Sequence, residues 1–193
     1  MIKDNDQIKS IADLVGAPRC TYVTAYTYEN MYKGYIVHSV EERFLDVLNH
    51  GSVEDKRESA GEFLFLNDVE VYTLDGKKKD ATANCLLNKN STLVIAESRI
   101  TAGELPPSKP FSYLSFQRKK AVWVNIMMRN LCITGQVYVG QDQESISLLD
   151  LEQMYIPVTR ATMIFALWPD LPKFDFLAVN KDRIVSILEL PPK

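Results

Sequence analysis

An internal repeat constrains this sequence more than any other feature. Two stretches, 63–97 and 155–189, follow the same order of apolar and polar residues at a constant offset of 92 residues. An Asn-Lys turn stands at the same place in both stretches, as Asn88-Lys89 and Asn180-Lys181. Each copy of such a repeat is one structural unit that packs on its neighbour. The chain of 193 residues is therefore predicted to contain two copies of about 85 to 95 residues.

The repeat continues upstream with a larger offset. The sequence around Gly34 matches the one around Gly135, which is an offset of 101 residues. The difference between the two offsets falls on the polar stretch 51–61, which we predict to be a loop insertion in the first copy. A proline-rich stretch separates the copies, and proline favours a connector over a strand or a helix interior. We therefore expect a first domain at 1–98, a linker at 99–110 and a second domain at 111–193.

Periodicity predicts a mainly β protein. Residues 5–15 have the apolar spacing of a short amphipathic helix, and Ser39 with Glu42 resembles a capping box before a helical turn at 41–48. Each copy then carries about five short runs of β-branched and aromatic residues, predicted as the following strands. They are 20–28, 31–38, 63–73, 83–87 and 93–96 in the first copy, and 120–128, 131–139, 155–167, 174–179 and 184–188 in the second. Because closure removes exposed strand edges, we expect two small five-stranded barrels.

This order of features resembles the Sm-like fold, with an N-terminal helix, bent strands, a glycine in the second strand and an Asp-x-x-[Met/Leu]-Asn turn. The matching residues are Gly34 and Asp46-Val47-Leu48-Asn49. The chain also resembles a bacterial family of unassigned function with an Arg-x-x-Asp-x-Leu-Asn motif, a Phe-Leu-x-Leu motif and an Asn-Lys turn. These motifs lie at 43–49, 63–66 and 88–89. The resemblance implies two tandem five-stranded Sm/SH3-like β-barrels.

Sm-like proteins bind single-stranded RNA with the Asp/Asn turn and with a turn between their last strands. By position, the resemblance places such a site on Asp46, Asn49 and Lys89, with Lys181 as the counterpart of Lys89 in the second copy. The family's Arg-Gly turn is replaced here by Asn-Lys, and the insertion interrupts the Asp/Asn turn. The alternative interpretation is that Asp46 and Asn49 bond to local backbone groups at a helix end, as short polar side chains often do.

No catalytic signature stands out in the sequence. It contains no glycine-rich phosphate loop and no Gly-x-Ser-x-Gly elbow, and the two histidines lie apart from the cysteines. We expect no metal and no cofactor, and we expect Cys20, Cys85 and Cys132 to be small buried residues. A crowd of carboxylates leaves a small hydrolase as a weaker alternative. These carboxylates are Glu41, Glu42, Asp46, Glu54, Asp55 and Glu58.

Composition limits the partners that the chain is predicted to have. A net charge of -3 argues against binding to duplex DNA. The sequence has no apolar run of membrane-spanning length and starts with a charged segment, so we expect a cytoplasmic protein. Its apolar strand positions exceed what one small barrel can bury. The leading hypothesis is a non-enzymatic assembly module that binds a protein partner or itself, and single-stranded RNA binding is the alternative.

Overall fold

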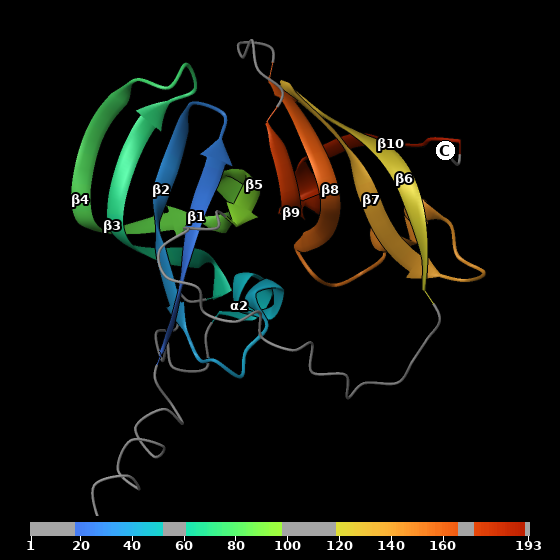
Figure 1. Cartoon of the computed structure of the whole chain (residues 1–193), viewed down its shortest axis with the longest axis horizontal. Coiled ribbons are helices and arrows are strands. Elements are labelled where there is room, and N and C mark those ends of the chain that lie inside the picture. Colours follow the sequence, from blue (N-terminus) through green and yellow to red (C-terminus); the bar gives the residue numbers. More distant parts are fainter. Residues whose placement is uncertain (1–17, 52–60, 98–118, 166–171, 192–193) are drawn as a thin grey trace, which may run out of the picture.

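The computed structural model describes residues 18–51, 61–97, 119–165 and 172–191. The helix expected at 5–15, the linker at 99–110 and most of the expected insertion lie outside these residues. Figure 1 shows the strands of the two halves side by side, with β5 of the first half between them.

The first half contains five strands and a short helix: β1 (Arg19–Thr27), β2 (Asn30–His38), α2 (Phe44–His50), β3 (Phe63–Thr73), β4 (Lys78–Asn88) and β5 (Thr92–Glu97). The second half contains β6 (Lys119–Met128), β7 (Leu131–Gly140), β8 (Tyr155–Phe165), β9 (Lys173–Asn180) and β10 (Ile184–Glu189). Three 3-10 turns accompany them: η2 (Lys89–Ser91), η3 (Ser145–Leu148) and η4 (Lys181–Arg183). The prediction of a mainly β protein is confirmed.

All ten strands belong to one antiparallel sheet, in the order β10-β6-β7-β8-β9-β5-β1-β2-β3-β4. The expected closure of each half into its own barrel is not confirmed, because β5 is paired on its second side with β9 of the other half. That pairing joins the halves into one open sheet. Among the described residues, β4 and β10 are the strands with a neighbour on one side only.

The same backbone details recur in both halves at the offsets found in the sequence. Gly34 and Gly135 each lie at a register shift with the next strand, and a Cβ on either glycine would approach backbone atoms of that strand within about 3 Å. Asp68 and Arg160 are the two described non-glycine residues with positive φ, and φ is 49° in both. The strand order of the first half is also the strand order of the second. The repeat in the sequence is therefore a repeat in three dimensions.

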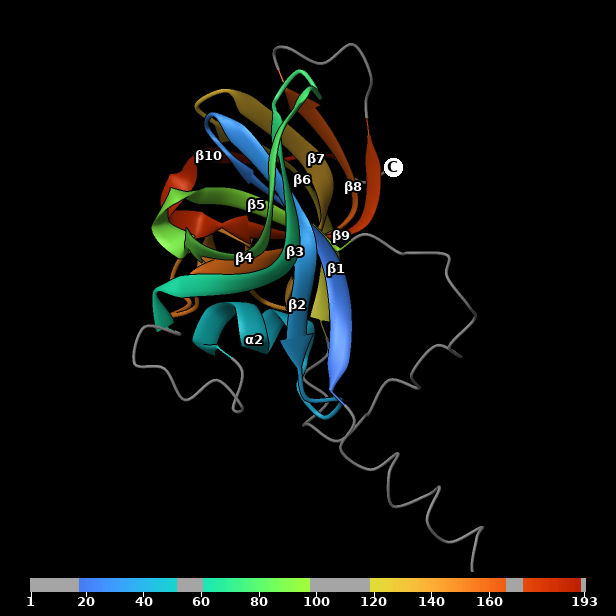
Figure 2. The same cartoon turned by 90° about the vertical axis from the view of Figure 1, so that its left-hand side faces the viewer.

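Helix α2 starts three residues later than the sequence predicted, at Phe44 instead of Glu41. One half of the expected capping box is formed, because the Ser39 N–H donates to the Glu42 carboxylate at 2.9 Å. Figures 1 and 2 both place α2 at one end of strands β1 and β2, where Val47 and Leu48 are buried. This helix has seven residues, and none of the described helices is long and apolar enough to cross a membrane.

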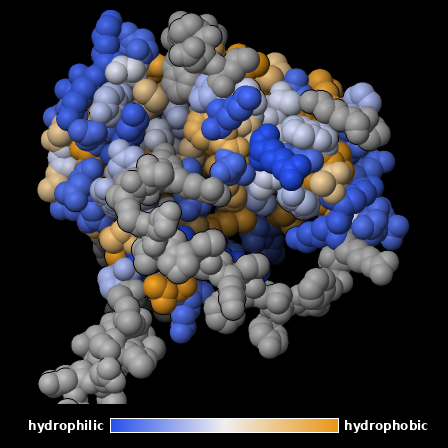
Figure 3. Space-filling model, in the orientation of Figure 1, coloured by the Kyte–Doolittle hydropathy of each residue, from blue (hydrophilic) through white to orange (hydrophobic). Residues whose placement is uncertain are grey.

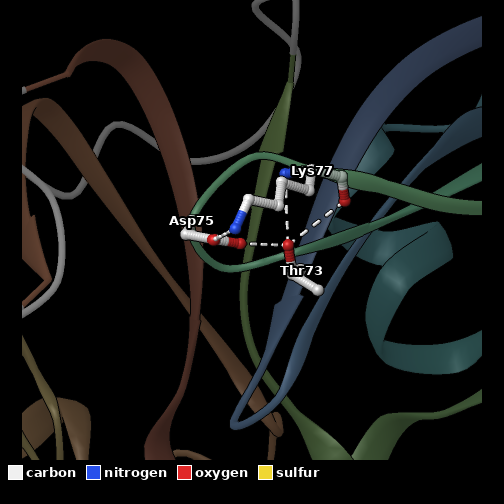
Figure 4. A network of polar contacts seen from close by, with 3 residues as sticks. All are labelled: Thr73, Asp75 and Lys77. Carbon is white, nitrogen blue, oxygen red and sulfur yellow. Dashed lines mark hydrogen bonds and ion pairs between the residues drawn. The ribbon is translucent and has the colours of Figure 1, made fainter.

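A polar network fixes the hairpin between β3 and β4. The Thr73 hydroxyl accepts a hydrogen bond from Lys77 N at 3.1 Å and donates to the Asp75 carboxylate, which pairs with the Lys77 ammonium at 3.0 Å (Figure 4). Gly76 supplies the positive φ, 86°, that the turn needs. The hairpin holds β4 against β3 at the edge of the sheet.

The buried residues form two clusters, and each cluster draws residues from both halves. Most of the first lies in the second half, but it includes Leu93, Val94 and Ala96 of β5. The other lies mainly in the first half and includes Tyr155 and Ala178 from the second. Figure 3 shows hydrophobic side chains along the middle of one face, between more hydrophilic flanks. Neither half thus completes its core alone.

Candidate functional site

The pairing of β5 with β9 is the contact that joins the two halves, and we call it the seam. Three residue pairs form it: Val94 with Val179, Ile95 with Ala178, and Ala96 with Leu177. All six side chains have an exposed fraction of 0%. Successive side chains of a strand point to opposite faces, so neighbours along β5 and β9 enter different cores. The seam is therefore both a backbone ladder and a shared part of two hydrophobic cores.

Asn180 is the main polar residue of the seam. Its side-chain amide donates to the carbonyl oxygens of Lys89 at 3.1 Å and of Thr92 at 2.9 Å, both in the other half. Its side-chain oxygen accepts from the Asp182 N–H at 3.0 Å and thereby caps the turn η4. A buried amide is stable only when its donors and acceptor are satisfied. One residue thus fixes a local turn and the position of the opposite half.

Tyr155 brings together two residues that the sequence predicted to share a ligand site, Asn49 and Lys89. The Tyr155 N–H donates to the Asn49 side-chain oxygen at 2.8 Å, and the Asn49 amide donates to the Tyr155 carbonyl at 3.2 Å. The Tyr155 hydroxyl donates to the Lys89 carbonyl at 3.3 Å. The Asn49 amide also donates to the Leu45 carbonyl of its own helix at 3.1 Å, as the alternative interpretation expected. Asn49 and Lys89 therefore both bond to Tyr155, a residue of the other half.

Lys89 is almost completely buried, with an exposed fraction of 1%. Removal from water disfavours its charged form, and the pKa of its ammonium group falls to about 8. An ammonium group buried this deeply is poorly placed to meet a phosphate from solvent. RNA binding at Asp46, Asn49 and Lys89 stays a prediction. The contacts that Lys89 makes with the other half are hydrogen bonds to its carbonyl oxygen from Tyr155 and Asn180.

The other two predicted site residues lie elsewhere. Asp46 is in the first turn of α2, and Lys181 is in η4, where its ammonium donates to the carbonyl oxygens of Leu149, at 3.3 Å, and Leu151. The Lys181 N–H donates to the Met154 carbonyl just as the Lys89 N–H donates to Glu62, both at 2.9 Å. Lys181 thus occupies the same place in the second half, at the start of η4, as Lys89 does in the first half, at the start of η2.

The groups considered for metal binding and catalysis do not converge in the part of the chain that the structure describes. Among these residues, no three His, Cys, Asp or Glu side chains gather around a common point. His38 is buried between the Thr21 hydroxyl, at 3.0 Å, and the Ser39 carbonyl, at 2.8 Å. The expectation of buried cysteines is wrong for Cys20, which is exposed, and Cys85 and Cys132 are half-buried. Three of the crowded carboxylates, Glu54, Asp55 and Glu58, lie outside the described residues.

An open hollow of about 530 Å³ lies over strands β1 to β4. Tyr22 and Tyr35 form one side, with ring centroids 5.0 Å apart, and Asp68 and Glu70 contribute carboxylates. Bonds from Lys78 and Tyr72 hold the pKa of Glu70 below its usual value. Tyr22 of β1 borders this hollow, whereas Tyr26 of the same strand is buried in the core.

The two outer edges of the sheet carry apolar residues at the positions that are buried in the seam. Strand β10 is the counterpart of β5, and β4 is the counterpart of β9. Val185 of β10 is 73% exposed and Leu188 is 56% exposed, whereas the counterparts Leu93 and Ala96 are both 0% exposed. Leu86 of β4 is 55% exposed, whereas its counterpart Ala178 is fully buried. In the part of the chain that the structure describes, these two edge strands thus expose apolar residues at positions equivalent to buried ones of β5 and β9, and neither has a partner strand on its outer side.

Comparison with known proteins gives no match, either to a family model, to a curated protein or to a solved structure. The site therefore rests on the geometry of this chain alone. Sequence reasoning did not find the seam roles of Asn180 and Tyr155, although the repeated Asn-Lys turn marked the place of the first. The sequence feature that could have indicated the free edge is the apolar character of β10, which it shares with its counterpart β5.

Proposed function

We propose that this chain is a non-enzymatic assembly module, built from two tandem five-stranded small-barrel units, which binds protein through the edges of its sheet. The observation that carries the proposal is the exposure of Leu86, Val185 and Leu188 on the strands β4 and β10. Unpaired edge strands present free N–H and C=O groups that can bond to another strand. Edges of stable monomers are usually protected by charge, bulges or coverage.

The two edges are protected only in part. The first half of β4 carries Lys78, Lys79 and Asp80, which are exposed and disfavour strand addition there. The second half of β4 carries Leu86 and Leu87 instead, and β10 carries exposed Val185 and Leu188. Full burial of one such side chain contributes about 1.5 to 3 kcal/mol. Apolar side chains beside free backbone groups support association through these short segments.

The test compares the wild-type chain with the double variant Leu86→Lys/Leu188→Lys, which places one charge on each edge. Light scattering after size exclusion gives the mass of each protein, and immobilised chains report retention of other proteins. Val40→Lys is the matched control, because Val40 is 51% exposed but lies outside the edge strands. We expect the wild type and the control to associate and the double variant to fail. Equal association by all three proteins, or by none, would contradict the proposal.

A further inference from the structure

We propose that the partner of each edge is a second copy of this chain, with β10 of one molecule pairing antiparallel with β4 of the next, as β5 pairs with β9 within the chain. This inference rests on the proposed function and names its partner. The reason is the repeat: β10 is the counterpart of β5, and β4 is the counterpart of β9. The chain pairs β5 with β9 internally and, within its described residues, presents their counterparts β10 and β4 as the unpaired outer strands of the sheet.

The seam sets the register of the proposed contact. The internal pairs are Val94 with Val179, Ile95 with Ala178, and Ala96 with Leu177. Moving each residue by the repeat offset of 92 gives the intermolecular pairs Ser186 with Leu87, Ile187 with Leu86, and Leu188 with Cys85. Five of these six residues are apolar. The contact would cover Leu86 and Leu188, two of the most exposed large apolar side chains among the described residues.

The bulge that shapes β5 is also present in β10. Strand β5 skips one residue, Leu93, in its pairing with β1, and β10 skips Val185 in its pairing with β6. The skipped Leu93 is buried in the core that spans the seam, whereas Val185 is 73% exposed. A bulge bends its strand and re-aims the neighbouring side chains. The edge of β10 therefore has the seam's backbone shape as well as its apolar sequence.

Asn88 supplies the polar part of the contact. Its side-chain oxygen accepts from Asn90 N at 2.7 Å, as the Asn180 oxygen accepts from Asp182 N. The Asn180 amide crosses the seam to two carbonyls, whereas the Asn88 amide has no hydrogen-bond partner among the described residues. By the repeat offset, its partners in a second copy are the carbonyl oxygens of Lys181 and Ile184. Asn88 is already held by its turn in the conformation needed to bond to them.

The geometry also determines the symmetry of the association. The contact joins two different surfaces, β4 and β10, so it is heterologous, and an assembly of any number of copies still has one free β4 edge and one free β10 edge at its ends. A two-fold contact of β4 with β4, or of β10 with β10, would not repeat the seam. These alternatives predict different behaviour when one edge at a time is blocked.

The experiment blocks the edges separately, with Leu86→Lys on β4 and Leu188→Lys on β10. Each variant alone is expected to remain a single chain of 22.0 kDa, because one of the two surfaces is blocked in every molecule. A mixture of the two variants is expected to form a one-to-one dimer, since each supplies the surface that the other lacks. The wild type is expected to exceed the mass of one chain under the same conditions, and Val40→Lys is the control.

A second variant tests the register through the polar contact. Asn88→Asp keeps the oxygen that caps the turn but replaces the amide donor with an oxygen that would face two carbonyls of the partner. We expect it to weaken association at least tenfold, as measured by the concentration dependence of the mass. The turn itself stays capped, so a folded chain is expected, and circular dichroism checks it.

Each contrary result has a distinct meaning. A wild-type chain that stays at the mass of one copy at every concentration would overturn the second copy as the partner, and the proposed function would then depend on another protein. Dimers formed by either single variant alone would overturn head-to-tail pairing but leave edge association in place. Association that survives the double-edge substitution would overturn the proposed function as well. Unchanged affinity in Asn88→Asp would contradict the register.

Discussion

Lys89 shows how strongly a single buried charge affects this molecule. Its carbonyl oxygen accepts hydrogen bonds from Tyr155 and Asn180 of the other half, and burial lowers the pKa of its ammonium group to about 8 from the ordinary 10.5. Between these two values the unfolded chain binds more protons than the folded chain, so the free energy of unfolding rises with pH. We expect a gain of about 2 kcal/mol from about pH 8 to about pH 10.

Chemical denaturation at several pH values measures this gain. The variant Lys89→Met removes the titrating group, and we expect its stability to lack the rise. Lys181→Met is the matched control, because Lys181 occupies the same place in the other copy but is not buried. If the free energy of unfolding depends on pH equally in the wild type and in Lys89→Met, the rise does not come from Lys89.

Gly34 is required by the close approach of two backbones. A Cβ at this position would lie 2.8 Å from the Asn67 carbonyl oxygen of the next strand, and a backbone atom cannot move aside cheaply. We expect Gly34→Ala to lower the free energy of unfolding by about 1 to 3 kcal/mol. Gly61→Ala is the control, because a Cβ there meets nothing within 4 Å. Thermal or denaturant unfolding in which the two variants lose equal stability would count against the close approach.

At the scale of elements, the seam and the free edges differ in one measurable respect. Both Asn180→Ala and Asn88→Ala remove the cap of a turn, but Asn180→Ala also removes two hydrogen bonds across the seam and leaves two carbonyls of the other half without this donor. We expect a loss of about 2 to 3 kcal/mol for the first and about 1 kcal/mol for the second. The measurement uses a Leu86→Lys background, which holds the protein as one copy. Equal losses would show that Asn180 does not fix the seam.

The sequence predicted the strands well where their pattern is local and apolar. Strands β2 and β7 lie within a residue or so of their predicted bounds, and β8 starts where it was expected. Strand β4 is longer than predicted, because it begins at Lys78 in a run of charged residues. Charged side chains are poor strand formers in general but are tolerated on an exposed edge. The sequence alone could not show that β4 is an edge.

Contacts between distant residues explain why the candidate site was predicted only in part. Asn49 and Lys89 were predicted to belong to one RNA site, and both bond to Tyr155, which belongs to the other half of the chain. The apolar pattern of β5 predicts that this strand is buried. The pattern does not indicate whether β5 closes a barrel or pairs with β9. That choice depends on contacts between residues far apart in the chain, such as the pairing of Ile95 with Ala178.

The whole molecule should unfold as one unit, because each of its two cores contains residues of both halves. Separate units would give two transitions, since each could lose its core independently. We expect a single calorimetric transition whose van't Hoff and calorimetric enthalpies agree, measured in the Leu86→Lys/Leu188→Lys double variant to exclude dissociation. Two resolved transitions would mean that the halves are independent and that the seam contributes little.

The central claim is that the free edges β4 and β10 are the two sides of a further seam. Hydrogen exchange of the full-length wild-type chain at low and high protein concentration tests it most directly. We expect the amides of 84–88 and 184–188 to become protected as the concentration rises, while those of the central strand β7 stay unchanged. Exchange at both edges that does not depend on concentration, whether or not the mass of the particle grows, would contradict the claim.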